Sequence, residues 1–299
     1  MKVAYSDIYI YQLPEGHRFP MEKYELLPQQ LLLENVVEES DFFEPDPCSD
    51  EILLWTHSPE YLHKLMHLDL SRKEERKIGF PVRSDLIARG RVIAHGTIEC
   101  AEHALIEGIA LNIAGGTHHA FRDRGEGFCI FNDFAIAANY LLRTEQVNQI
   151  LIIDLDVHQG NGTASIFRNE ERVFTLSVHG HQNYPIFKEK SDLDIAVKNG
   201  TQDDEYLDTI QKHIPPVIDQ VRPDIVFYLS GVDVLGTDKL GQLDLSLKGC
   251  MDRDNIIFEF CKEKGLPVAV SMGGGYSKHI KDIVNAHANT YKAARKVFG

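Results

Sequence analysis

Asp154, Asp156 and His158 are spaced by two residues near the middle of the chain. In an extended backbone alternate side chains project from the same face, so the two carboxylates and the imidazole are expected to lie together. Groups of this kind either repel one another or bind a cation. The plainer interpretation is that the motif only ends a strand, with its carboxylates facing solvent.

Asp233 follows a second apolar run and would complete a set of two aspartates and one histidine. Three protein ligands leave one coordination position open for water and substrate, as catalytic metal sites require. Mixed nitrogen and oxygen ligation favours Zn²⁺, and Fe²⁺ would also suit this set. Because 299 residues bury enough surface to fold without a metal staple, a metal here is expected to serve chemistry.

Glycine-rich turns precede three further reactive side chains. His118 and His119 follow Gly115-Gly116, and Tyr276 follows three glycines that begin at Gly273. Glycine lets the backbone come close to a ligand, so these turns indicate a binding site. The alternatives are a hydrogen-bonded histidine pair in a loop and a tyrosine packed beside a turn.

The elements that must position these residues alternate along the chain. Short apolar runs predict strands over Val3–Tyr5, Ile52–Trp55, Ala110–Ala114, Ile150–Asp154, Val173–Val178, Ile225–Leu229 and Val268–Ser271. Periodic segments predict helices over Tyr24–Glu38, Arg91–Glu107, Asp133–Leu142, Asp203–Val221, Met251–Lys264 and Lys278–Val297. This alternation indicates an α/β fold with a mainly parallel sheet covered on both faces. Ligands of such sheets bind beyond the carboxyl ends of the strands, where the reactive residues would meet.

No linker, repeat or low-complexity tract interrupts this pattern, so residues 1–299 are predicted to form a single domain. One feature works against a predicted helix. Pro215 and Pro216 lie within the segment 203–221, and because neither offers an N–H, the pair is expected to bend or break that helix.

The composition is that of a soluble globular protein, with 43% hydrophobic and 25% charged residues. A formal net charge of −14 makes nucleic acid and anionic membranes poor partners, whereas a cationic peptide would be attracted. The five cysteines form no Cys-x-x-Cys pair and fit a reducing compartment. With no apolar run of signal-peptide or membrane-span length, we expect a cytoplasmic protein without membrane insertion.

Taken together, these motifs resemble the zinc-dependent histone deacetylase family. The matching pieces run in the family's order: Gly115-Gly116-Thr117-His118-His119, Gly127-Phe128-Cys129, Asn132-Asp133, Asp154-x-Asp156-x-His158, Gly231-x-Asp233 and Gly273-Gly274-Gly275-Tyr276. The class IV branch is the most similar, on the residues 159–162, 200–207 and 238–241. The resemblance implies a three-layer, arginase-like α/β sandwich around a parallel sheet.

The resemblance also implies a reaction, hydrolysis of the amide of an acylated lysine. Asp156, His158 and Asp233 would hold Zn²⁺, which binds the acyl carbonyl and polarises the attacking water. His119 would serve as general base and then as general acid. The remaining implied roles are electrostatic: His118 paired with Asp154 as the second histidine, and Tyr276 as hydroxyl donor to the oxyanion.

Two further sites follow from the same resemblance. Phe128 and Tyr184 would line a narrow tunnel for the lysine stem, the Gly127 carbonyl would accept a bond from the substrate amide, and Gly274 would lie at the substrate site. A structural K⁺ would be bound by main-chain carbonyls and one hydroxyl, from Asp154, Asp156, His158, Ser177 and Val178.

The sequence departs from the family at two positions. Gly79 lies where many deacetylases carry an acidic residue that grips the substrate backbone, which argues against sequence-specific peptide binding. Asn161 stands where class I members carry an aspartate beside the catalytic histidine. Because a neutral amide does not stabilise imidazolium, it should leave His119 with a lower pKa.

The leading hypothesis is a zinc deacylase acting on acyl-lysine in a peptide or protein. Similarity to class IV implies that long fatty acyl groups are removed better than acetyl. The alternatives are hydrolysis of a small acylated amine such as an acetylpolyamine, and a pseudoenzyme that binds acyl-lysine or assembles with partners. A binuclear manganese hydrolase on the same fold would need more bridging carboxylates and histidines than these strands offer.

Overall fold

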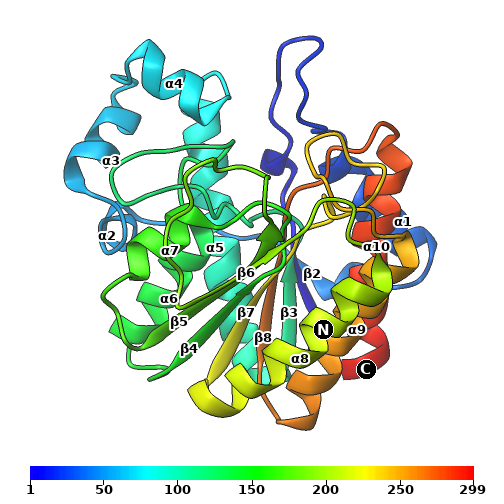
Figure 1. Ribbon diagram of the computed structural model, residues 1–299. Helices are drawn as coiled ribbons and strands as arrows, with labels where there is room; N and C mark the ends of the chain where they lie inside the picture. The colour runs from blue at the N-terminus through cyan, green and yellow to red at the C-terminus, as the bar shows by residue number, and fades with distance from the viewer.

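The computed structural model describes residues 1–299, and its centre is one eight-stranded sheet (Figure 1). All strand pairings are parallel, in the order β2-β1-β3-β8-β7-β4-β5-β6, which confirms the predicted α/β class. The strands are β1 (Lys2–Ala4), β2 (Phe42–Phe43), β3 (Ile109–Asn112), β4 (Ile150–Asp154), β5 (Val173–Gly180), β6 (Leu193–Val197), β7 (Ile225–Ser230) and β8 (Val268–Met272).

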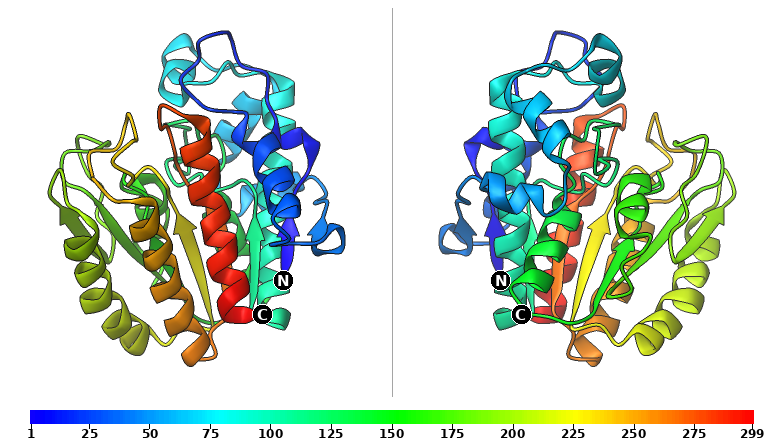
Figure 2. Two further views of the ribbon diagram at one scale, coloured as in Figure 1. Left: turned by 90° about the vertical axis from the view of Figure 1, so that its right-hand side faces the viewer. Right: turned by 90° about the vertical axis from the view of Figure 1, so that its left-hand side faces the viewer.

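Helices cover both faces of the sheet. One layer contains α5 and α6, and the other contains α8, α9 and α10 with α1 packed on α10 (Figure 2). The helices are α1 (Lys23–Leu33), α2 (Asp50–Leu54), α3 (Pro59–Met66), α4 (Arg72–Ile78), α5 (Ser84–Glu107), α6 (Asp133–Arg143), α7 (Asn161–Phe167), α8 (Asp203–Val221), α9 (Leu247–Glu263) and α10 (Ile280–Phe298). None of them is long and apolar enough to cross a membrane.

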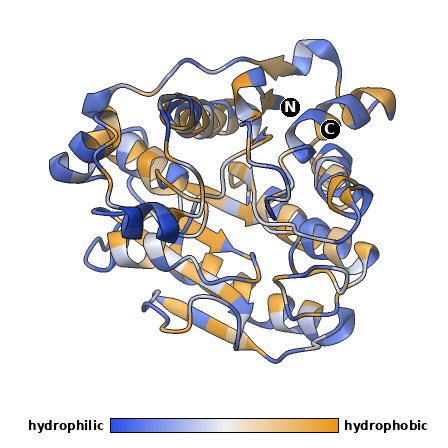
Figure 3. Cartoon of the chain, turned by 90° about the horizontal axis from the view of Figure 1, so that it is seen from above, coloured by the Kyte–Doolittle hydropathy of each residue, from blue (hydrophilic) through white to orange (hydrophobic).

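The central strands form the core. Every residue of β3, β4, β7 and β8 is buried, as expected for parallel strands covered on both sides. Figure 3 shows the apolar residues on these strands and the hydrophilic ones on the outward faces of the helices. The loops that follow the strands gather above the sheet in Figure 1, beside α4, and this edge holds the reactive residues.

One local prediction is wrong, and of the bend or break expected in α8 the structure excludes the break. Ile52–Trp55 is not a strand, because α2 begins at Asp50 after Ser49, whose Oγ accepts a hydrogen bond from the Ile52 N–H at 3.3 Å. Serine followed by acidic residues is a helix-start signal, and here it outweighs the apolar run. Pro215 and Pro216 do not break α8, since its apolar face is buried along the helix on both sides of the pair.

The sequence does not predict β6, which lies at the edge of the sheet. Its burial alternates and its second residue is Asp194, so it lacks the continuous apolar run of the central strands. The sequence does not predict β2 either, because two residues are too few to form a recognisable apolar run.

Candidate active site

The carboxyl ends of β4 and β7 lie side by side and carry the predicted metal ligands. Asp154 ends β4, and the chain then leaves the strand in a bend. The Asp156 N–H donates to Asp154 Oδ1 (3.1 Å), and the His158 N–H donates to Asp156 Oδ1 (2.9 Å). Each carboxylate thus binds the N–H two residues on, as aspartates do in turns. The spacing of two therefore reflects this turn, and the predicted extended conformation through His158 is wrong.

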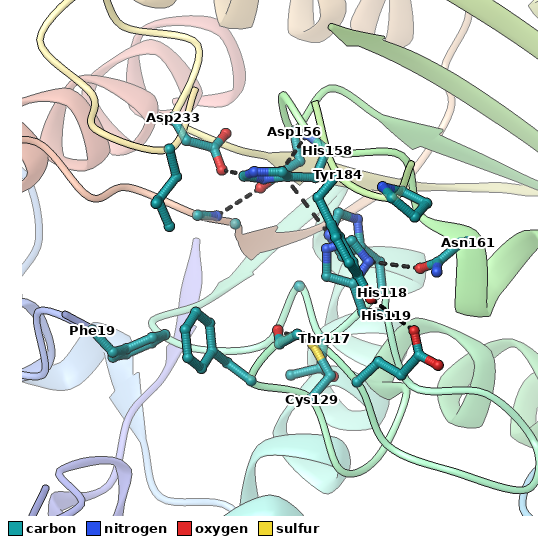
Figure 4. A pocket seen from close by; sticks show the side chains of 18 of the residues that line it. Phe19, Thr117, His118, His119, Cys129, Asp156, His158, Asn161, Tyr184 and Asp233 are labelled. Atoms are coloured by element: carbon teal, nitrogen blue, oxygen red, sulfur yellow. Dashed lines mark hydrogen bonds and ion pairs between the residues drawn. The ribbon is translucent and has the colours of Figure 1, made fainter. Parts of the chain in front are cut away.

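Asp156, His158 and Asp233 form a compact, buried cluster (Figure 4). Their ligand atoms lie within 4.8 Å of one another, and His158 Nδ1 is 3.0 Å from Asp156 Oδ1 and 3.1 Å from Asp233 Oδ2. Burial, together with the charge of Asp156, raises the pKa of Asp233 to about 7. Two buried carboxylates that repel each other beside an imidazole are stabilised by a cation, so this donor set fits a divalent metal ion.

The adjacent histidines of the 115–119 loop have different partners. His118 Nδ1 lies 2.7 Å from Asp154 Oδ2, whereas His119 Nδ1 lies 2.7 Å from Asn161 Oδ1. Although burial opposes a charged ring, Asp154 raises the pKa of His118 to about 9. Burial and the two neighbouring imidazoles of His118 and His158 lower the pKa of His119 well below its usual value.

Asn161 also determines which ring nitrogen of His119 is free. The Gly162 N–H donates to Asn161 Oδ1 at 3.1 Å, which identifies this atom as the amide oxygen. The facing Nδ1 of His119 must then carry a proton, and Nε2 is left as the acceptor. The two pKa shifts run in opposite directions, which favours a charged His118 beside a neutral His119 that can take up a proton.

Asp133 holds the loop that carries this pair. Its buried carboxylate accepts hydrogen bonds from the N–H groups of Gly116 (3.2 Å) and Thr117 (2.7 Å) and from the hydroxyls of Thr97 (2.8 Å) and Ser271 (3.0 Å). In the sequence Asp133 belongs to a matching motif but has no assigned role. Its position at the start of α6, directly after the cap residue Asn132, is the signal that points to a structural carboxylate.

Tyr276 lines the same cavity and lies on the loop after β8. Its N–H donates to Asp238 Oδ2 at 2.5 Å, and Asp238 Oδ1 accepts two further N–H groups of its own turn at 2.8 Å. Burial, with the charge of Asp233 adding to it, raises the pKa of Tyr276 well above its usual value, so the hydroxyl keeps its proton. In the sequence Asp238 belongs only to a segment similar to the class IV branch, and that similarity does not reveal its role in positioning Tyr276.

The cavity has a volume of about 820 Å³, within the range of small-molecule sites. Its walls include Phe128 and Tyr184, and the Tyr184 ring meets His119 edge-on with 5.0 Å between centroids. Gly127 passes so close to His119 that an added Cβ would lie 2.5 Å from its Cδ2, and the backbone there has φ +56°. Only glycine fits that position. In Figure 4, Phe19 lies across the cavity from the histidines.

Of the remaining predicted residues, one lines the cavity and two are buried outside its lining. Gly274 lines the cavity, and its N–H donates to Asp156 Oδ2 at 2.7 Å. Ser177 is paired in register with Asp154 between β4 and β5, and Val178 follows it, both buried. Ser177 Oγ lies 3.0 Å from His179 Nδ1. These residues thus gather at the β4–β5 junction, where binding of K⁺ stays a prediction.

Comparison with known proteins identifies the family of this site. The model of the histone deacetylase domain matches residues 17–291. The chain belongs to the histone deacetylase family. Histone deacetylase 2 of Arabidopsis thaliana is 32% identical over 290 residues, which cover 93% of this chain and 75% of the plant protein. The acetoin utilization protein AcuC of Staphylococcus aureus is 29% identical, with 82% and 68% covered.

A bacterial relative and two solved structures are also similar. An uncharacterised protein of Picosynechococcus is 41% identical, with 99% of both chains covered. A histone deacetylase homologue from Aquifex aeolicus superposes with a TM-score of 0.83 at 25% identity, covering 98% of this chain and 83% of its own. A homologue solved in complex with SAHA gives 0.83 at 26% identity, covering 100% and 84%. These superpositions confirm the predicted arginase-like deacetylase fold.

Proposed function

We propose that this protein is a zinc-dependent deacylase that hydrolyses the amide between an acyl group and the ε-amine of lysine. The observation that carries the proposal is that the Asp156–His158–Asp233 cluster, His119 and Tyr276 line one cavity. Membership of the histone deacetylase family supports a hydrolase of this kind. The similarity to a homologue that binds SAHA supports a ligand in the same cavity.

In this proposal Asp156, His158 and Asp233 hold the metal ion. Zn²⁺ suits the mixed donor set, as Fe²⁺ would, and when bound it supplies Lewis-acid polarisation of the acyl carbonyl and of water. K⁺ near Ser177 would offset the carboxylates at the end of β4. We further propose that the protein acts in the cytoplasm.

The chain's own groups then move the proton and stabilise charge. His119 accepts a proton from the attacking water at Nε2 and returns it to the leaving amine, which its neutral state permits. The cationic His118, held by Asp154, stabilises developing negative charge. Tyr276 donates its hydroxyl to the oxyanion, since its raised pKa keeps the proton in place.

Substrate binding uses the walls of the cavity. Phe128 and Tyr184 pack on either side of the lysine stem, and the Gly127 carbonyl accepts a hydrogen bond from the amide N–H. We expect long fatty acyl groups to be removed better than acetyl.

A panel of lysine substrates with acyl chains from acetyl to myristoyl tests this function on purified protein. We expect release of the acyl group, loss of activity with a chelator and recovery when Zn²⁺ is added back. An acetylpolyamine measured alongside separates the small-amine alternative. If the polyamine is cleaved faster than every acyl-lysine, acyl-lysine is not the substrate. If the metal-loaded protein hydrolyses none of these compounds, the proposed activity is overturned.

Asn161→Asp is expected to shift the acidic limb of the profile of kcat/KM against pH. The new carboxylate would face His119 Nδ1 at the present 2.7 Å and favour imidazolium, which raises its pKa. Since His119 must be neutral to accept a proton, the limb should move to higher pH, by roughly one unit. If the acidic limb stays in place while the variant is folded and loaded with metal, the role of His119 as the base is contradicted. The control His119→Ala should remove most activity.

A further inference from the structure

The mouth of the cavity carries positive charge, although the chain as a whole carries −14. Four cationic side chains line the outer part of the cavity, against only two carboxylates outside the metal cluster, Glu126 and Glu189. The cationic residues are Arg18, Arg76, Lys77 and Arg124. The local charge is thus opposite in sign to the net charge of the molecule.

Two of these cations belong to a fixed network. Lys77 Nζ lies 3.2 Å and Arg124 Nε 2.9 Å from the buried Glu126 carboxylate, which also accepts the Tyr184 hydroxyl at 2.7 Å. Arg124 additionally pairs with Asp123 at 3.0 Å. Glu189, the second carboxylate, is paired with Arg168. Both acids of the mouth are therefore already neutralised by partners of this chain.

Arg18 and Arg76 have no carboxylate partner. Both are exposed; Arg18 lies over the Phe128 ring, with Cζ 5.0 Å from its centroid, and Arg76 Nε donates only to the Arg72 carbonyl at 3.1 Å. Because Phe128 is a wall of the cavity, Arg18 lies at its entrance. Arg76 projects from the last turn of α4. Two uncompensated guanidinium groups thus border the opening.

Their positions are held by the neighbouring backbone. His17 Nε2 lies 2.9 Å from the Gly79 carbonyl, which joins the loop of Arg18 to the end of α4, and Phe19 packs edge-on against Phe128 at 5.4 Å. Gly79 has φ +83°, and a Cβ there would lie 2.9 Å from the Phe128 ring. A side chain, acidic or otherwise, is therefore strained at this point, and the rim keeps its positive charge.

Two further residues of the cavity lining are apolar and exposed. Ile186 is 87% and Phe187 90% exposed, and both line the cavity just after Tyr184. Adjacent in sequence, these two side chains give the cavity lining exposed apolar surface that an apolar residue of a substrate could cover. The rim therefore offers both guanidinium groups and exposed apolar side chains.

We propose that this rim selects acyl-lysines that lie in acidic, apolar segments of proteins and disfavours basic segments. The inference rests on the proposed function and names the substrate class of that site. Carboxylates that flank the acyl-lysine would meet Arg18 and Arg76, for which guanidinium groups are well suited, while a neighbouring apolar residue covers Ile186 and Phe187. Basic residues at the same positions would meet like charges.

Matched peptides with one acyl-lysine and acidic, neutral or basic flanking residues test the proposal. We expect kcat/KM to be about three- to tenfold higher for acidic than for basic flanks, the size that a few exposed ion pairs supply. The difference should shrink in high salt because these charges are screened. Arg18→Glu and Arg76→Glu should each reduce or reverse the preference. Arg72→Glu, on the same helix but outside the cavity lining, should leave it unchanged.

Fluorescence anisotropy with the same labelled peptides separates this proposal from the proposed function, because it measures binding without turnover. Tighter binding of the acidic peptide with no hydrolysis of any peptide would support the rim and overturn the activity. Equal binding and equal kcat/KM for peptides with acidic and basic flanks would overturn the proposal that the rim selects acidic segments. Free acyl-lysine, with its own carboxylate, is a further arm. If free acyl-lysine is cleaved as efficiently as the acidic peptide, the proposal that the substrate is a protein segment is overturned.

Discussion

Asp233→Ala is expected to lose both the bound metal ion and the activity. The cluster offers three protein ligands around an open position, and two ligands do not hold a divalent ion firmly at such a site. The metal content per chain after dialysis, measured by elemental analysis, should fall close to zero, and turnover should fall with it. His158→Ala should behave in the same way.

A matched variant separates metal binding from folding. Asp233 Oδ1 also accepts the Val157 N–H at 3.0 Å, so the alanine variant leaves a buried donor without a partner. Asp233→Asn keeps an oxygen for this bond but removes the charge, and we expect it to fold and still bind the metal poorly. Full metal occupancy with normal turnover in the alanine variants would overturn the assignment of the cluster.

The sequence predicts the centre of the fold because the central strands are apolar at nearly every position. Ile150–Asp154 is predicted with the observed bounds, since burial on both faces leaves a continuous apolar run. Edge strands carry no such signal: β6 alternates in burial. The helix start at Asp50 is not predicted because the apolar run Ile52–Trp55 also fits a strand, and only the serine before Asp50 indicates a helix.

The candidate site is only partly predictable for a related reason. Residue type and the adjacent glycines single out His118, His119 and Tyr276, whose chemistry is local. Asp133 and Asp238 act by accepting N–H groups, some of them from distant segments, and no pattern in the sequence records those partners. Their roles appear only once the chain is folded.

The charge around the cavity is also not predictable from the sequence. The net charge of −14 predicts attraction of cationic peptides, but it averages over the whole surface. Arg18 and Arg76 come from separate segments that are joined by the contact between His17 and Gly79. The potential that a substrate meets at the cavity is set by this local arrangement, so composition alone does not predict it.

Tyr276→Phe is expected to reduce kcat by about 10²–10³, the usual cost of removing one oxyanion donor. The substitution removes only the hydroxyl. The ring should stay in place, since it contacts Phe19 and Phe128 with 6.0 Å between centroids and its main chain is held by Asp238. Metal content should be unchanged because no ligand is altered, and KM should change little because the bond strengthens only in the transition state.

Tyr184→Phe is the matched control for this effect. Its hydroxyl donates to Glu126, away from the metal cluster, so its loss should loosen a wall of the cavity and act mainly on KM. A fall in kcat of less than about threefold in Tyr276→Phe would contradict its role as donor, given the expected magnitude. An equal fall in kcat in both variants would show that the ring environment, and not the Tyr276 hydroxyl, limits turnover. A large loss in kcat that is confined to Tyr276→Phe, at constant metal content, therefore identifies the hydroxyl that stabilises the oxyanion.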